Sequence, residues 1–240
     1  MSDLFNEFTQ LREDGRKANE VRFIDAQIST IPGCTGSSHF KIGETEIIAQ
    51  VFGPKEPLMN KTKSTLAEIR CSFNFSQFAK IPHPSESKIL RDKESEFIIK
   101  RVFEAAIRRD QFPGSIFEIY ITVIQDDGSS IPAAINAVTL ALMDGGIPMW
   151  DLATGTSVSY ICDHILLDAG RKESRSTYPY LELAFFPTSK KIISMTTTTS
   201  VPDSILDQMI EMAKDGCSLI KEHIHDLIMK DKTIFIQDYL

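Results

Sequence analysis

The chain has 240 residues, of which 42% are hydrophobic and 25% are charged, and its formal net charge is -7 at pH 7. This composition is typical of a globular protein with a substantial core. The acidic balance excludes a broadly basic surface that coats nucleic acid, although a local basic groove is compatible with it. The sequence has no apolar stretch long enough to predict a transmembrane helix. Its acidic N-terminus does not resemble a signal peptide, so we expect a soluble, intracellular protein.

In chain order, residues 1–18 predict a polar N-terminal arm, and a meander of strands follows it. Alternating apolar and polar residues between turn residues predict these strands. Their approximate bounds are Val21–Thr30, Ser37–Ile42, Glu46–Phe52 and Glu68–Ser76. Residues 53–65 contain proline and three lysines and predict an exposed loop.

A long helix is predicted from about Ser87 to Arg109, because apolar residues recur there at helical spacing. Its apolar stripe consists of Phe97, Ile98, Val102, Ala105 and Ala106. A Phe-Pro-Gly break at 112–114 precedes a strand over Ser115–Ile124. A second, apolar helix then begins after the Gly-Ser turn at 128–130 and ends at Gly145.

The remaining chain predicts four strands and a last helix. The strands lie near Trp150–Cys162, His164–Asp168, Tyr180–Phe186 and Lys191–Thr197. The helix begins at residues 201–204, and the C-terminal tail, 230–240, either adds a final strand or frays. Strand meanders interrupted by helices predict an α+β fold with helices packed on mixed sheets. No low-complexity linker divides the chain, so we predict one domain over 1–240. Trp150 is expected in the core or at a subunit interface.

The cysteines and histidines predict no metal site. Cys34, Cys71, Cys162 and Cys217 are scattered, with no CxxC pair. We therefore expect four buried free thiols and no zinc. His223 and His225 are two positions apart on a predicted helix, so they face different directions.

The turn formed by Gly128, Ser129 and Ser130 stands at the start of the second helix. Unpaired N–H groups and the helix dipole converge at such a position and can bind an anion such as phosphate. Ser129 and Ser130 are also good candidates for an ordinary N-cap. The turn alone leaves both interpretations open.

Several segments together resemble the RNase PH family, and within it the exosome ring subunit equivalent to the archaeal catalytic ring member. They occur in family order at Arg12–Lys17, Gly36–Ser38, Ala49–Pro54, Phe103–Ile107, Val123–Gly128, Leu140–Leu142 and Gly145–Met149. The resemblance implies an RNase PH-like fold, built from duplicated ribosomal-protein-like βαβ halves. It also implies a place in a six-subunit ring through which single-stranded RNA passes.

Active members of that family cleave the 3′ end of RNA with inorganic phosphate, and the resemblance allows their site to be compared with this chain. A basic residue follows the Gly-Ser step of their phosphate-binding loop, and that residue is Ser130 here. Their two catalytic carboxylate positions fall on Ser174 and Tyr180. Neither side chain can bind a divalent cation as a carboxylate does. We therefore expect no catalytic residue, no metal and no cofactor, with Glu173 the nearest substitute.

The family also has an arginine pair that clamps RNA, and it falls on Leu90 and Arg91. Arg91 is either an RNA contact or an ordinary solvated charge, and the two interpretations carry equal weight. We predict that RNA is held at the ring channel by Lys61, Lys63, Arg70, Lys88 and Arg91. Backbone charge supplies such binding, which makes it weak and salt-dependent.

These expectations define a first hypothesis, a non-catalytic exosome ring subunit that guides single-stranded RNA to associated nucleases. Its expected partners are other RNase PH-like subunits in a hetero-hexameric ring, RNA-binding cap subunits and an associated exonuclease, with no membrane. The nucleus, including the nucleolus, and the cytoplasm are the expected locations. Two alternatives are an active phosphate-dependent 3′-to-5′ exoribonuclease that uses Glu173, and a homomeric ring that binds RNA without cutting it.

Overall fold

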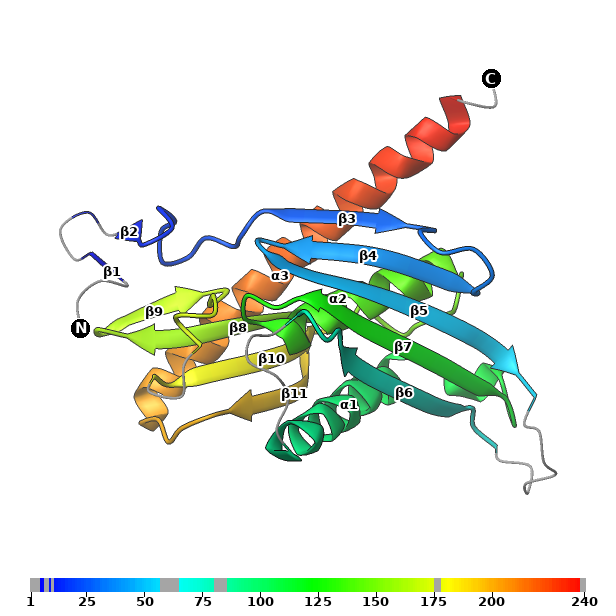
Figure 1. Cartoon of the computed structure of the whole chain (residues 1–240), viewed down its shortest axis with the longest axis horizontal. Helices are drawn as coiled ribbons and strands as arrows, with labels where there is room; N and C mark the ends of the chain where they lie inside the picture. The colour runs from blue at the N-terminus through cyan, green and yellow to red at the C-terminus, as the bar shows by residue number, and fades with distance from the viewer. Residues whose placement is uncertain are drawn as a thin grey trace.

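The computed structural model describes residues 5–6, 9, 11–56, 65–79, 86–174 and 178–237, with side chains outside 5–6, 86–92 and 230–237. Two short strands, β1 (Phe5–Asn6) and β2 (Leu11–Arg12), pair with each other in the N-terminal arm. The rest of the described chain forms two sheets and three α-helices, with the second helix between the sheets (Figure 1). None of the described helices is both long enough and apolar enough to span a membrane.

The first sheet is mixed and has the strand order β3-β4-β5-β7-β6. Its strands are β3 (Ile24–Ile28), β4 (Gly36–Ile42), β5 (Thr45–Lys55), β6 (Glu68–Phe75) and β7 (Ile116–Gln125). Burial alternates strictly along β5, as expected for a strand with one face on the core. β6 and β7 are parallel, so α1 (Glu86–Ala106) makes the crossover between them, followed by the short 3-10 helix η1 (Arg109–Gln111).

The second sheet is antiparallel and has the strand order β11-β10-β8-β9. Its strands are β8 (Thr154–Ile161), β9 (His164–Leu167), β10 (Tyr180–Phe186) and β11 (Lys191–Thr197). Cys162 and Asp163 form the tight turn between β8 and β9, and both have positive φ, as two-residue hairpins of this type require.

Helix α2 (Ser130–Asp144) packs against β4 and β5 of the first sheet and β8 of the second. It is buried on all sides from Pro132 to Leu142, which explains its largely apolar sequence; the side chains of Asn136 and Thr139 hydrogen-bond to backbone groups at Gly155 and Ala153. Helix α3 (Asp203–Gln237) crosses the opposite face of the second sheet, and its C-terminal end extends past β3 (Figure 1). The predicted α+β fold is therefore confirmed.

The structure corrects several details of the sequence prediction. Phe97 is 58% exposed, while Phe103, which the predicted stripe omitted, is fully buried. Trp150 is 61% exposed and lies under the guanidinium of Arg108, which contradicts the core and leaves the subunit interface of the two expected places. The helical residues 234–237 contradict a final strand at the C-terminus, because α3 continues through them.

Two further expectations fail for local reasons. The loop expected from residue 53 begins later, because β5 continues through a cis Gly53–Pro54 bond to Lys55. Only Cys71 and Cys217 are buried; Cys162 occupies the exposed hairpin turn and Cys34 is half-buried. All four thiols are free.

Candidate functional site

The loop before α2 is held tightly by its own chain. The hydroxyl of Thr45 donates to the carbonyl of Gly128 at 2.8 Å and accepts from the N–H of Asp127 at 3.1 Å. The guanidinium of Arg22 donates to the Asp127 carbonyl at 3.1 Å. Gly128 has φ +92°, and a Cβ there would lie 2.7 Å from the backbone of the 169–171 loop. The glycine is therefore required by both conformation and space.

Ser129 is not the ordinary N-cap that the sequence allowed. It adopts a left-handed conformation, with φ 57°, and its side chain does not cap the helix. Its buried hydroxyl instead donates to the Ala169 carbonyl at 2.7 Å and lies 2.5 Å from the Ser157 hydroxyl. Ser130 is the first helical residue. The loop thus presents an uncapped helix start without a basic side chain in its own sequence.

A buried ion cluster joins the N-terminal arm to the end of β9. Asp168, 2% exposed, accepts from Arg22 Nε at 2.9 Å and from Arg22 Nη2 at 2.8 Å. Arg16 lies 3.6 Å from the same carboxylate. Burial alone would raise the pKa of Asp168, but the charge and hydrogen bonds of Arg22, with the charge of Arg16, bring it below its ordinary value. These contacts give Asp168 a structural role.

Glu173, the sequence-predicted substitute for the lost carboxylates, is fixed in place. Its carboxylate accepts from the Gly170 N–H at 2.9 Å and lies 3.5 Å from Arg12 Nη1. The side chain is almost fully buried, and burial raises the pKa of Glu173 despite the opposing charge of Arg12. Moving this carboxylate toward a reacting phosphate requires breaking both contacts.

The two positions that correspond to catalytic carboxylates carry no acid. Ser174 ends the turn after β9, and its hydroxyl is 3.4 Å from the Arg171 carbonyl. Tyr180 points inward from β10, and its hydroxyl donates to Glu182 Oε1 at 3.1 Å. Burial raises the pKa of Tyr180 well above its ordinary value, an effect that the charge of Glu182 strengthens, so the phenol stays protonated.

Glu182 is the residue that sequence reasoning missed. It lies two positions after Tyr180 on β10, so both side chains occupy the same face of the sheet. The half-buried Glu182 lies beside the first turn of α2, at Ile131 and Pro132. Burial raises the pKa of Glu182 to about 7, which the Tyr180 hydrogen bond partly offsets and the charge of Asp126 reinforces. The sequence did contain one signal for this contact, because residues two positions apart on a strand face the same side of the sheet.

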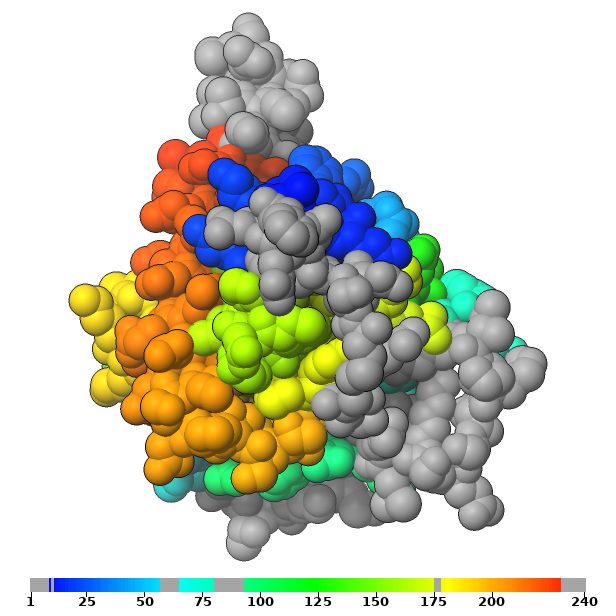
Figure 2. Space-filling view, turned by 90° about the vertical axis from the view of Figure 1, so that its left-hand side faces the viewer, coloured from blue at the N-terminus to red at the C-terminus, as the bar shows by residue number. Residues whose placement is uncertain are grey.

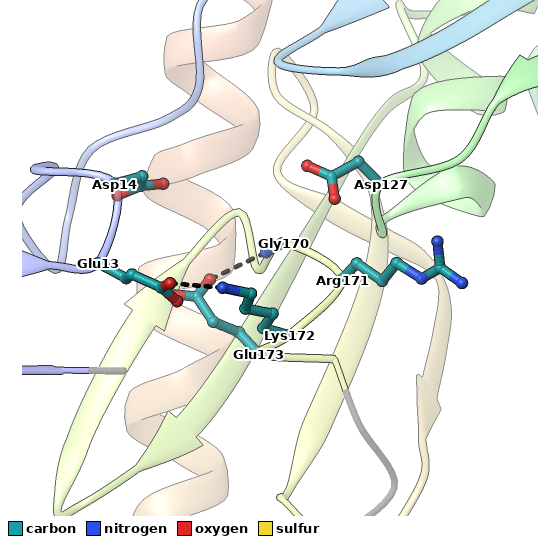
Figure 3. A pocket seen from close by; sticks show the side chains of 7 residues that line it. All are labelled: Glu13, Asp14, Asp127, Gly170, Arg171, Lys172 and Glu173. Atoms are coloured by element: carbon teal, nitrogen blue, oxygen red, sulfur yellow. Dashed lines mark hydrogen bonds and ion pairs between the residues drawn. The ribbon is translucent and has the colours of Figure 1, made fainter. Parts of the chain in front are cut away.

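A pocket of about 310 Å³ opens between the arm, the loop before α2 and the turn after β9. Its lining is Glu13, Asp14, Asp127, Gly170, Arg171, Lys172 and Glu173 (Figure 3). Lys172 forms an ion pair with Glu13, and Asp127 points toward the arm, 3.7 Å from Arg22 (Figure 3). Burial raises the pKa of Asp127 against the charge of Arg22. The acidic side chains make this pocket a poor acceptor for phosphate.

Of the five sequence-predicted RNA contacts, the structure describes the side chain of Arg70 alone. Lys61 and Lys63 lie outside the described residues. Lys88 and Arg91 belong to α1, where only the backbone is described. Arg70 is exposed on β6 and paired with Glu68, with Nε 3.0 Å from Oε1. Within the described part of the chain, no group of three or more His, Cys, Asp or Glu side chains is arranged to hold a metal ion.

Comparison with known proteins places this architecture in a family. The profile described as 3′ exoribonuclease family, domain 1 (RNase PH) matches residues 20–148. The chain therefore belongs to the RNase PH family, which confirms the resemblance read from its sequence.

Individual relatives are similar over nearly the whole chain. The exosome complex component RRP41 homolog of Arabidopsis thaliana is 32% identical over 224 residues, 92% of each chain. Exosome complex component RRP41 of Mus musculus is 31% identical over 230 residues, 90% of this chain and 92% of that protein. Rice Rrp46 has the same fold, with a TM-score of 0.78 at 24% identity over 89% of this chain and 98% of its own. A chain of the Archaeoglobus fulgidus exosome with RNA bound to the active site gives a TM-score of 0.74 at 18% identity, over 90% and 93% of the two chains.

Proposed function

We propose that the chain is a non-catalytic RNase PH-like subunit of an RNA exosome ring. It scaffolds the ring and helps to guide single-stranded RNA to associated nucleases, for RNA processing, including that of rRNA, and degradation. The RRP41 relatives are exosome components, and their similarity to this chain supports the assembly. The expected partners are other RNase PH-like subunits, RNA-binding cap subunits and an exonuclease, in the nucleus and the cytoplasm.

The observation that carries the non-catalytic assignment is the side chain of Tyr180. A phenol with a raised pKa occupies a position where active relatives place a metal-binding carboxylate, and Ser174 occupies the other such position. Phosphorolysis also needs a phosphate bound beside the RNA end. Ser130 supplies no cation for that phosphate, and the pocket beside the loop is acidic. Loss of the metal ligands and of the phosphate-binding cation together predicts no measurable phosphorolysis.

The deciding experiment is a phosphorolysis assay on the purified chain, alone and with an RNase PH-like ring partner. The reaction contains single-stranded RNA, Mg²⁺ and inorganic phosphate, and nucleoside diphosphate release is measured. We expect none in either sample. Ser174→Asp with Tyr180→Asp in the same chain restores both carboxylates but not the phosphate-binding cation, so we expect no release from this variant either. Release by the unmodified chain contradicts the proposal.

A phosphate-dependent exoribonuclease is the second candidate, and one observation favours it. Glu182 places a carboxyl group beside the start of α2, on the same face of β10 as Tyr180. If the chain releases diphosphate, Glu182→Gln and Glu173→Gln distinguish the two possible acids. Loss of activity in Glu182→Gln alone assigns the reaction to the face of β10, whereas loss in Glu173→Gln alone assigns it to the turn after β9.

Guidance of RNA is tested separately on the assembled ring. Arg91→Glu with Lys88→Glu should weaken RNA binding and reduce its salt dependence, because each lost cation removes a phosphate contact. Arg101→Glu with Lys93→Glu is a matched control, since it makes the same charge change on exposed residues of the same helix. Equal binding by the two variants removes Lys88 and Arg91 from the proposed RNA path.

A further inference from the structure

Trp150 and Arg108 form a stacked pair at the surface of the molecule. Two backbone hydrogen bonds join the segments that carry them. The N–H of Arg108 donates to the Pro148 carbonyl at 3.0 Å, and the N–H of Trp150 donates to the carbonyl of Ala106 at 2.8 Å. The guanidinium carbon of Arg108 lies 4.2 Å from the centre of the Trp150 ring, within the range of a cation–π interaction. The end of α1 and the segment after α2 therefore fix the pair in place.

The pair leaves an aromatic surface and a cation available to a ligand. Trp150 is 61% exposed, although the guanidinium lies over its ring. Arg108 forms no ion pair with a described residue, and its buried Nε has no hydrogen-bond partner. Buried polar groups are usually paired, so this nitrogen is an exception within the fold. An arginine stacked on an aromatic ring is well suited to recognise a phosphate or a carboxylate.

Two exposed lysines lie on a turn that is tied to the same segment. The carboxylate of Asp151, the residue after Trp150, accepts from both the N–H and the hydroxyl of Ser189 at 2.8 Å. Ser189 belongs to the turn between β10 and β11, and Lys190 and Lys191 follow it directly. Neither lysine forms an ion pair with a described residue. The turn therefore adds two cations to the surface next to Trp150.

This turn lies on the opposite side of the second sheet from the N-terminal arm. Figure 2 shows the arm against the β9 side, where the N–H of Leu167 donates to the Ala18 carbonyl, whereas β10 and β11 form the other side. There, Nζ of Lys221 on α3 donates to the hydroxyl of Thr188 at 2.9 Å. The turn is thus held by Asp151 and by α3, while its residues 188–191 remain exposed.

We propose that four residues, Arg108, Trp150, Lys190 and Lys191, form a second binding site for single-stranded RNA, separate from the predicted channel contacts. One base stacks on the exposed surface of the Trp150 ring, and the three cations of this Trp150 patch contact phosphates. Sites for single-stranded nucleic acid combine such an aromatic platform with positive charge. An acidic peptide would use the same cations but leave the exposed indole unused, so the stacked pair favours RNA. The inference depends neither on ring assembly nor on the absence of catalysis.

The first test uses the fluorescence of the full chain, because Trp150 is its only tryptophan. Titration with a short oligoadenylate at low salt should give saturable quenching, since a stacked base lies in contact with the indole. An abasic ribose-phosphate oligomer of the same length and polyglutamate are the matched controls, and neither should quench. Absence of quenching by RNA, or equal quenching by either control, overturns the proposal.

The second test measures the affinity of variants for labelled RNA by fluorescence anisotropy, with circular dichroism confirming that each variant folds. Trp150→Ala should raise the dissociation constant about fivefold to a hundredfold, the range for loss of one stacked base, and Trp150→Phe should recover most of the affinity. Phe97→Ala is the matched control, because Phe97 is 58% exposed with the Arg101 guanidinium carbon 5.6 Å from its ring centre. It should bind like the unmodified chain. Equal affinities of Trp150→Ala and Phe97→Ala overturn the proposal.

The two lysines are tested through the salt dependence of RNA binding. Lys190→Gln with Lys191→Gln should reduce the slope of log binding constant against log salt concentration by about 1.4, which is about 0.7 for each lost phosphate contact. Lys41→Gln with Lys55→Gln makes the same charge change on the first sheet and should leave the slope unchanged. Equal slopes in the two double variants overturn the proposal.

The assembled ring separates RNA from a neighbouring subunit as the occupant of the exposed indole. The chain is labelled with fluorotryptophan before assembly, and fluorine NMR then follows Trp150 alone. RNA should shift this signal in the ring as it does in the free chain. A signal that assembly shifts and RNA then leaves unchanged assigns Trp150 to a subunit interface and overturns the proposal. Arg91→Glu with Lys88→Glu should leave the RNA-induced shift in place, so failure of the channel contacts and failure of the Trp150 patch are distinguishable.

Discussion

Asp168 is buried and Glu182 is half-buried, and their surroundings shift the pKa values of the two carboxyl groups in opposite directions. Two arginines contact Asp168 and hold its pKa below the ordinary value. In the described structure the Glu182 carboxyl group accepts a hydrogen bond from the Tyr180 phenol, and burial raises the pKa of Glu182 to about 7. Burial acts on both groups, so the guanidinium partners make the difference. Among the described side chains, Arg22 and Arg16 thus lie against Asp168, whereas no arginine contacts the Glu182 carboxyl group.

The largest expected effect comes from removing the cation beside Asp168. Arg22→Ala leaves a buried carboxylate without its main partner and should lower the free energy of unfolding by about 3 to 5 kcal/mol. Arg70→Ala is the control, because it breaks an exposed ion pair with Glu68 and should change stability by less than about 1 kcal/mol. Chemical denaturation of both variants measures the difference. Similar losses in the two variants mean that the buried cluster is not a special source of stability.

The stability of the fold should also be sensitive to a substitution of Gly128 in the loop before α2. Gly128→Ala forces a Cβ to 2.7 Å from backbone atoms at a positive φ, and we expect a loss of about 2 to 4 kcal/mol. Gly114→Ala is matched in backbone conformation, with φ +73°, but no atom lies within 4 Å of its Cβ. It should lose only about 1 kcal/mol. Equal losses of stability in the two variants would mean that the positive φ alone causes the loss at Gly128, and that the close approach to the 169–171 loop does not contribute.

Glu182 should make stability depend on pH in a defined window. Its pKa is about 7 in the folded chain against an ordinary value of 4.5, so the folded state holds the proton more tightly than the unfolded state. Stability from this group is present below about pH 4.5 and is lost as pH rises to about 7, by about 3 to 4 kcal/mol at most. The lowered pKa of Asp168 acts at lower pH and in the opposite direction.

Glu182→Gln tests this effect, because the amide does not titrate. Denaturation at several pH values should show the stability of the variant rising relative to the unmodified chain between pH 4.5 and 7, with a constant difference above that range. Parallel stability curves across the window contradict the raised pKa.

The smallest effect is expected from Tyr180→Phe. The phenol hydrogen bond lowers the pKa of Glu182 against the effect of burial, so its loss should move the Glu182 titration upward. Carbon-13 NMR of the carboxyl group measures the midpoint, and Tyr178→Phe is a control on a nearby residue. A midpoint that does not move means that the Tyr180 hydroxyl does not influence the pKa of Glu182.

The fold was predictable from sequence where one periodicity dominated. The alternation along β5 and the largely apolar sequence of α2 predicted both elements. The sequence did not predict the exposure of large aromatic side chains that could lie either in the core or against an arginine at the surface. Trp150, expected in the core or at a subunit interface, is exposed with the Arg108 guanidinium over its ring, and Phe97 is exposed with Arg101 beside it. Such pairs depend on tertiary geometry, which a single sequence does not display.

For the candidate site, the sequence predicted which residues occupy the family's catalytic positions but not how their side chains are arranged. Resemblance assigned Ser174 and Tyr180 to the carboxylate positions, but it did not reveal where their side chains point. The left-handed Ser129 and the role of Glu182 depend on contacts between the loop before α2 and β8 to β10, far apart in the chain. Arg22 and Asp168 are 146 positions apart, and no local pattern links them.

That separation also has a consequence for synthesis. Arg22 leaves the ribosome long before Asp168 exists, and at about 5 to 20 residues per second the interval is roughly 7 to 30 s. During that time Arg22 and the arginine of the arm, Arg16, lack their carboxylate partner Asp168. The ion pair between Arg22 and Asp168 therefore forms only after the end of β9 has been synthesised.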